Sequence, residues 1–249
     1  MPFPTGPLIA AVAFAVIFLL GSDVLIPGPI RRRKRRLLSF GAGITIAYVF
    51  VHLLPELEAA RVALARDVSR MALPFPALRV YLAALIGFML FYGLEYLVKR
   101  MRKVPVSGAG PAEENRVGRM IHTAGFLAYV WLAGYLAVRG FEEGPTRTAL
   151  YTAALGLHFL SLDYVLSREY GRWYEAKARY AFAAAPLAGW AVGIFSGFSQ
   201  FFSAALLGFL SGGIILNAIA AELPDEKEGR LHYFILGGVL YTALLIILS

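Results

Sequence analysis

The sequence predicts an all-α integral membrane protein whose eight transmembrane helices form a 3+2+3 inverted repeat. Of the 249 residues, 59% are apolar or aromatic and only 16% are charged, and the mean hydropathy is +0.65. All 24 Lys and Arg residues lie outside eight windows of 18 to 21 residues. A helix needs about 20 residues to cross ~30 Å of hydrocarbon, so each window is long enough for one span. This composition excludes an ordinary soluble enzyme and a disordered chain.

The eight windows give the element order, and the whole chain, 1–249, forms one polytopic membrane domain. The predicted spans are Leu8–Ile26, Leu37–Leu54, Val80–Val98, Met120–Val138, Ala149–Leu166, Tyr180–Phe198, Phe201–Ala221 and Leu231–Leu248. The sixth and seventh spans are joined by a very short turn at Ser199-Gln200. The segment before the first span has no positive region, so we expect this span to stay in the mature chain.

The distribution of basic residues predicts the orientation. Of the 24 Lys and Arg, 18 lie in the first, third, fifth and seventh connections, which places those connections in the cytoplasm and both termini outside. The run Arg31–Arg36 is expected to contact anionic lipid headgroups, and we expect no nucleic-acid partner. Residues 99–119 are predicted to be a cytoplasmic linker. The expected location is the inner or plasma membrane of a prokaryote.

The second and seventh spans carry the evidence for an internal repeat. When Pro55 is laid on Pro224, an offset of 169 residues, both spans have an early glycine, a polar side chain in the middle and a Leu-Pro-acid exit. The matched residues are Gly43 with Gly212, Tyr48 with Asn217, and Pro55-Glu56 with Pro224-Asp225. These two spans run in opposite directions in the predicted topology. Inverted repeats with proline-interrupted spans are typical of transporters.

Ionisable groups inside the spans are few, and each is a candidate functional residue because burial in hydrocarbon is costly. Three acids and all four histidines fall within the windows, while the chain has no cysteine to act as thiolate ligand or nucleophile. We interpret Asp23, Glu95 and His232 as interface groups, because they lie near predicted membrane surfaces.

Span 2 carries Thr45, Tyr48, His52 and Glu56 at steps of three, four and four residues, which places them on one helical stripe. One interpretation is a polar entry path that captures a divalent cation at its outer mouth, and Asn217 of span 7 extends this path. The alternative is that His52 bonds to a backbone carbonyl near Pro55.

The central spans contain the candidate ligands. His158 lies near the predicted midplane of span 5 with Ser161 on its face, and Asp163 is turned partly away. His122 lies nearer the cytoplasmic end of span 4. Each histidine is either a ligand or proton-handling group, or a hydrogen-bond donor between packed helices worth roughly 1 kcal/mol.

His52-Leu-Leu-Pro-Glu56 and the stretch from Gly87 to Glu95 resemble the ZIP family of zinc and iron permeases. The eight spans, external termini and basic third connection agree with that family. The resemblance implies divalent-metal transport, no permanently bound cofactor, no enzymatic reaction and a homodimer.

The central helices depart from the family motifs. Only His122 remains of the span 4 motif, and only His158 and Asp163 remain of the span 5 motif. Phe126 and Phe159 replace ligand positions, so the resemblance implies at most a mononuclear site. Its ligands would be His122, His158 and Asp163, with Ser161, a set that suits zinc or a similar divalent ion.

Three functions therefore remain open. The first is a reduced ZIP-like transporter of a divalent cation. The second is a ZIP-fold protein that has lost transport and acts as a structural or regulatory protein. The third is an intramembrane hydrolase that uses zinc on His122, His158 and Asp163 to activate water.

Overall fold

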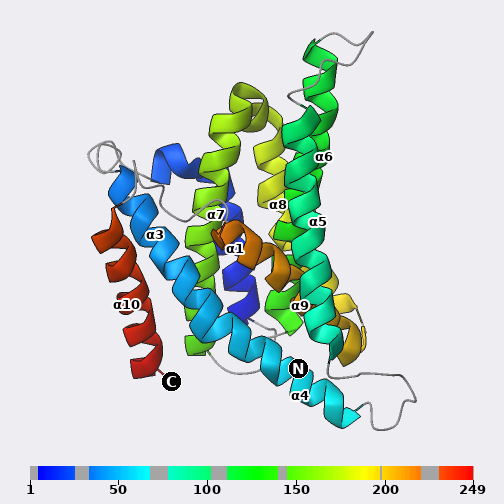
Figure 1. The fold of residues 1–249 in the computed structure, drawn as a ribbon, viewed down its shortest axis with the longest axis vertical. Coiled ribbons are helices and arrows are strands. Elements are labelled where there is room, and N and C mark those ends of the chain that lie inside the picture. Colours follow the sequence, from blue (N-terminus) through cyan, green and yellow to red (C-terminus); the bar gives the residue numbers. More distant parts are fainter. Residues whose placement is uncertain are drawn as a thin grey trace.

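The computed structural model describes residues 5–25, 34–67, 78–101, 111–139, 145–196, 198–219 and 230–248, and within these ranges it is almost entirely helical and contains no strand (Figure 1). The helices are α1 (Thr5–Leu25), α3 (Lys34–Tyr48), η1 (Val49–Leu53), α4 (Leu54–Asp67), α5 (Arg79–Met101), α6 (Pro111–Arg139), α7 (Pro145–Trp173), η4 (Tyr174–Ala178), α8 (Arg179–Phe195), α9 (Gln200–Asn217) and α10 (Leu231–Leu248). The two η segments are π-helical turns. The all-α prediction is thus confirmed for the described residues.

Several helices are long and apolar enough to span a membrane, as the sequence predicts. The stretches that meet both criteria are Thr5–Ser22, Ser39–Leu64, Arg79–Arg100, Arg116–Val138 and Thr148–Phe195. The last of these contains the predicted fifth span and most of the sixth. Helices α9 and α10 are apolar but shorter, and Ser199 caps α9 by accepting a hydrogen bond from the backbone N–H of Phe202.

Large apolar side chains cover the outside of the helix bundle. Helix α5 exposes Ile86, Met89 and Leu90, and α10 exposes Val239 and Ile247, each by more than half of its surface. Contiguous exposed apolar surface of this kind is unfavourable in water. It is the surface expected of helices in contact with lipid.

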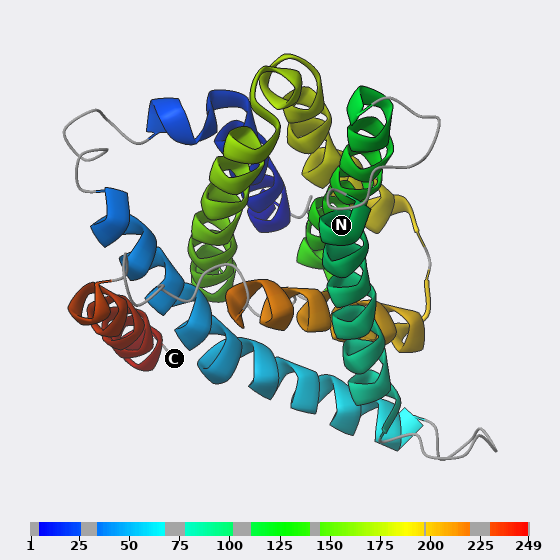
Figure 2. The ribbon, with the colours of Figure 1, turned by 45° about the horizontal axis from the view of Figure 1, so that its top comes forward.

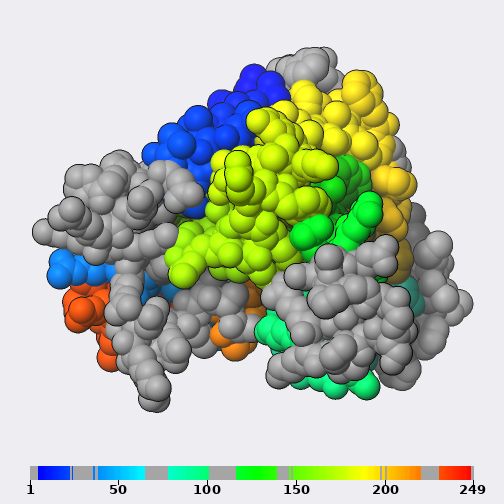
Figure 3. Space-filling model, turned by 90° about the horizontal axis from the view of Figure 1, so that it is seen from above, coloured from blue at the N-terminus to red at the C-terminus, as the bar shows by residue number. Residues whose placement is uncertain are grey.

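The helices pack in pairs that run in the same direction. Helix α10 lies along α3 at the edge of the molecule, and rings of Tyr48 and Tyr241 meet 6.4 Å apart (Figure 2). Helices α5 and α9, α6 and α8, and α1 and α7 form the other close pairs. Seen from above, the end of α7 lies between α1 and α6 (Figure 3).

Glycines allow three of these pairs to cross at backbone contact, namely α6 with α8 through Gly134 and Gly189, and the α3 and α10 and the α5 and α9 pairs. A Cβ on Gly43 would overlap the carbonyl oxygen of Phe234, and one on Gly237 would overlap that of Phe40. In the α5 and α9 pair, a Cβ on Gly212 would overlap the carbonyl of Ala84, and one on Gly87 would overlap that of Phe209. Each of the three crossings therefore depends on glycine at two positions.

The second predicted span continues past Pro55 as one long helix of α3, η1 and α4 (Figure 2). A proline inside an α-helix removes one backbone hydrogen bond and crowds the preceding turn. Here the turn before Pro55 is π-helical, and the N–H of Leu54 donates to the carbonyl of Val49. This wider turn accommodates the ring without ending the helix.

Two connections differ from the sequence prediction. Helix α6 begins at Pro111, so the second half of the predicted 99–119 linker is helical, while residues 102–110 lie outside the described part of the chain. Between the fifth and sixth predicted spans the chain stays helical and reverses at Gly171, whose φ of 50° favours glycine.

An aromatic core joins the helices from the inside. Phe14 of α1 packs edge-on against Phe159 of α7, with centroids 4.9 Å apart, and Phe159 also meets Tyr129 of α6. Tyr48 of α3 meets Tyr151 of α7. All five side chains are buried, and they fix the positions of α6 and α7 at the centre.

Candidate functional site

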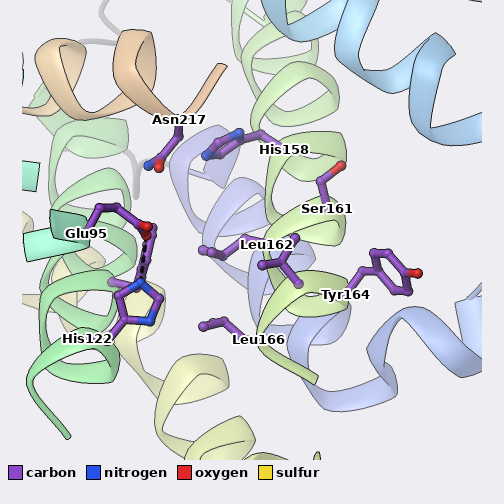
Figure 4. A pocket seen from close by; sticks show the side chains of 10 residues that line it. Glu95, His122, His158, Ser161, Leu162, Tyr164, Leu166 and Asn217 are labelled. Atoms are coloured by element: carbon purple, nitrogen blue, oxygen red, sulfur yellow. Dashed lines mark hydrogen bonds and ion pairs between the residues drawn. The ribbon is translucent and has the colours of Figure 1, made fainter. Parts of the chain in front are cut away.

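One cavity lies among α5, α6, α7 and α9 and has a volume of about 160 Å³ (Figure 4). Most of its lining is apolar, and the polar side chains come from different helices. The polar residues that line it are Glu95, His122, His158, Ser161, Tyr164 and Asn217. Pockets with apolar walls and a few convergent polar groups are the usual form of small-ligand sites.

Glu95 and His122 form a close polar pair on one wall of this cavity. Nε2 of His122 lies 2.7 Å from Oε1 of Glu95, and its Nδ1 lies 2.6 Å from the hydroxyl of Tyr170. On the outer side of Glu95, Nζ of Lys99 lies 3.1 Å from Oε2. A hydrogen-bonded chain therefore runs from Tyr170 in α7 to the exposed Lys99 at the end of α5.

His158 and Asn217 stand on the opposite side of the cavity and point toward each other (Figure 4). Nε2 of His158 forms a 2.9 Å hydrogen bond with the hydroxyl of Tyr129. Asn217 is 7% exposed, and its Nδ2 has no hydrogen-bond partner among the described residues. A buried amide without a partner costs free energy, which indicates room for a ligand or water at this point.

The sequence-predicted ligands are only partly brought together. His122, His158 and Ser161 line the same cavity, but the side chain of Ser161 points away from His122 and Glu95 in Figure 4. Asp163 does not line the cavity. Within the described ranges, no three His, Asp or Glu side chains converge closely enough to hold a metal.

Asp163 instead ties α7 to a break in α1. Its fully buried carboxylate accepts hydrogen bonds from the backbone N–H of Ser22 at 2.6 Å and from the hydroxyl of Tyr174 at 2.9 Å. Arg179 lies 3.8 Å away through Nε. Helix α1 breaks at Gly21, which has a φ of 71° and touches the Arg179 guanidinium. The carboxylate caps the freed N–H, which is a structural role.

The four side chains predicted to line an entrance path lie along one helix, but their surroundings differ from one residue to the next. Thr45 is buried and donates to the carbonyl of Gly41, so its hydroxyl is used within α3. The ring of Tyr48 stacks on His52 at 5.3 Å, and Nε2 of His52 lies 3.9 Å from Oε2 of Glu56. These side chains share one face of the long second helix.

Sequence reasoning placed Glu95 at the membrane interface, and the structure gives it a second role as a cavity wall. The sequence feature that could have revealed this position is the four-residue spacing of Gly87, Phe91 and Glu95, which places Glu95 on the packing face of α5. Tyr170 and Tyr129, the partners of the two histidines, gave no comparable signal, because their pairing depends on how α6 and α7 meet.

A scan against protein-family models finds no match for this chain. A search of the curated proteins also finds no significant match.

Proposed function

We propose that the protein is a multi-pass membrane transporter for a divalent metal cation, with a ZIP-like 3+2+3 arrangement and a site for one ion. The observation that carries the proposal is the cavity between the central helices α6 and α7 and the flanking helices α5 and α9. Imidazole, carboxylate and amide groups line this cavity within an apolar wall. Intramembrane ionisable groups of this kind mark ion pathways.

The helix crossings support the repeat. The offset that lays Gly43 on Gly212 also lays Phe40 on Phe209, and one further constant offset lays Ala84 on Phe234 and Gly87 on Gly237. The contacts of Gly43 with Phe234 and of Gly237 with Phe40 therefore correspond to those of Gly212 with Ala84 and of Gly87 with Phe209. The same glycine-to-carbonyl pattern joins Gly134 to Pro186 and Gly189 to Trp131 between α6 and α8, so the crossings support the repeat only together with the sequence likeness of spans 2 and 7.

The helix pairs follow the same scheme. If spans 1–3 correspond to spans 6–8, the pair α3 with α10 corresponds to α9 with α5, and the pair α1 with α7 corresponds to α8 with α6. The cavity then lies beside the two central helices, α6 and α7, which correspond only to each other in the proposed repeat. Transporters with inverted repeats carry their sites at such positions.

The donor set suits a borderline divalent ion such as zinc. His158 supplies an imidazole, Glu95 a carboxylate and Asn217 an amide, and His122 orients Glu95 through its Nε2. Zinc accepts nitrogen and oxygen ligands at about 2.0–2.2 Å, so the side chains would have to close on the ion. Glu95 thus replaces Asp163 in the ligand set that the sequence suggested.

A second candidate is a ZIP-fold protein without transport. It is favoured by the existing hydrogen bonds, because both ring nitrogens of His122 and the hydroxyl of Thr45 already have partners. The hydrolase alternative requires His122, His158 and Asp163 around one zinc. Asp163 points to α1 and α8 instead, so this set is not assembled.

Zinc binding to detergent-purified protein separates the two candidates. We expect about one zinc per chain and a rise in Tm with zinc, both lost in His158→Gln, whose amide can still bond to Tyr129. His232→Gln is the matched control, because His232 is exposed on α10, outside the cavity. Protein in liposomes should then carry zinc to an enclosed dye. A wild-type Tm that zinc does not change would favour the non-transporting candidate.

A further inference from the structure

A second hollow lies on the outer face of the α3 and α10 pair. It has a volume of about 550 Å³ and runs between the two helices. Its lining is apolar apart from Thr242 and includes Gly43, Ala47, Phe50, Gly238, Ala243 and Ile246. The glycine crossing brings the two backbones together and forms the floor of this groove.

The groove is open because α10 has one neighbour. Among the described helices, α10 packs extensively on α3 alone, and it lies at the edge of the molecule in both ribbon views (Figures 1 and 2). Phe50 at one end is 64% exposed, and Ile246 is 67% exposed. Apolar side chains so placed require an apolar occupant.

Positive charge gathers at one end of the groove. Helices α3 and α10 begin at this end, and the guanidinium of Arg36 lies 5.5 Å from the ring of Tyr233. The hydroxyl of Ser39 accepts a hydrogen bond from the backbone N–H of Arg230 at 3.1 Å, which fixes the start of α10 beside α3. Arg36 and Arg230 are both exposed. None of the residues that line the groove is charged, and the two arginines lie beyond its end, because Arg36 precedes the first lining residue of α3 and Arg230 that of α10.

An apolar groove with two cations at one end matches the shape and charge of one class of molecule. An anionic phospholipid has a phosphate headgroup for the arginines and an acyl chain for the groove. The basic-residue count places the beginnings of both helices on the cytoplasmic side, where anionic lipids are concentrated. A zwitterionic lipid would place its own cation near the arginines and gain less.

We propose that the α3 and α10 groove is a specific binding site for an anionic diacyl phospholipid. The phosphate lies between Arg36 and Arg230, and one acyl chain lies along Gly43, Gly238 and Ala243. The site is separate from the cavity at His158, so it does not depend on the proposed transport.

Native mass spectrometry of the detergent-purified protein tests the site with two lipids of identical acyl chains, phosphatidylglycerol and phosphatidylcholine. We expect tighter binding of phosphatidylglycerol. The double variant Arg36→Gln/Arg230→Gln should weaken phosphatidylglycerol binding about thirty-fold, at somewhat over fivefold for each charge, and weaken phosphatidylcholine binding much less. The charge-matched control is Arg100→Gln/Arg168→Gln, because both residues are exposed on other helices.

A second variant tests the apolar half of the site. Ala243→Trp fills the groove from an exposed position and should weaken both lipids, whereas Ala184→Trp on the exposed face of α8 should weaken neither. Equal affinity for the two lipids, or an arginine double variant that binds like its control, would overturn the proposal. So would a lipid-free dimer that Ala243→Trp dissociates, because the groove would then hold a second copy. If Ala243→Trp does not fold, the arginine variant still decides.

Discussion

At the scale of single residues, a substitution of Glu95 distinguishes a cation site from a purely structural contact. Replacing Glu95 by Gln keeps the size of the side chain and one acceptor oxygen for His122, but removes the charge and the ion pair with Lys99. We expect Glu95→Gln to fold and to lose at least tenfold in zinc affinity, because the carboxylate is the one negatively charged ligand of the proposed set. Isothermal titration of purified protein measures this loss. Glu58→Gln, an acid paired with Arg61 on α4, should bind zinc like the wild type.

Asp163 is expected to show the opposite behaviour. Asp163→Asn leaves the Arg179 guanidinium buried without its anion, which should lower the free energy of unfolding by about 3 kcal/mol. Zinc binding, scaled to folded protein, should stay unchanged because Asp163 lies outside the cavity. The double variant Asp163→Asn/Arg179→Gln should recover part of the loss in a double-mutant cycle. A zinc site abolished by Asp163→Asn alone would return this residue to the ligand set.

These two acids show what the sequence could predict about the site. His122, His158 and Asn217 were identified because polar groups in apolar spans are conspicuous, and all three line the cavity. Asp163 looked the same in the sequence, but its partners Ser22 and Arg179 come from distant helices. The break at Gly21 that frees the N–H of Ser22 has no sequence pattern that distinguishes it from other glycines in apolar helices.

At the scale of helices, the glycine crossings give a paired prediction. A Cβ at Gly43 or at Gly212 would meet a backbone carbonyl of the neighbouring helix, which cannot move aside as a side chain can. We expect Gly43→Ala and Gly212→Ala to destabilise the protein by similar amounts, about 1–3 kcal/mol each. Gly41→Ala is the control on α3, because nothing lies within 4 Å of an added Cβ there, and it should be neutral or slightly stabilising. Thermal unfolding in detergent measures all three, and a Gly212→Ala variant as stable as Gly41→Ala would contradict the equivalence of the crossings.

The positions of the helices could be predicted because each uncharged apolar window is about as long as a membrane span has to be. The ends were less predictable. Continuation past Pro55 depends on the π-helical turn at Val49–Leu53, and the helical path through Gly171 depends on one residue with positive φ. Neither conformation follows from hydropathy, since both are local backbone adjustments.

At the scale of the whole molecule, the two halves of the proposed repeat differ in their packing. Leu94 of α5 packs on Gly125 of α6, whereas its counterpart Leu244 of α10 is 45% exposed. Within the described residues, α10 makes no comparable contact with α7. Inverted repeats exchange such arrangements when a transporter opens to the other side. In the proposed transporter, α5 would therefore leave α6 during transport, while the α5 and α9 pair stays together.

The absence of cysteine from the chain makes this inference testable by disulfide trapping. Leu94→Cys/Gly125→Cys places two thiols across the α5 and α6 contact, and the smaller side chain at 94 makes room for the new one at 125. We expect oxidation to reduce zinc flux in liposomes to background and a reductant to restore it. The control Phe91→Cys/Gly213→Cys joins α5 to α9, where an added Cβ at Gly213 would meet the Phe91 ring that the substitution removes, and should transport when oxidised. Full flux through the oxidised 94/125 variant would show that α5 and α6 move as one body, so the exchange of packing between the two halves would have to occur elsewhere.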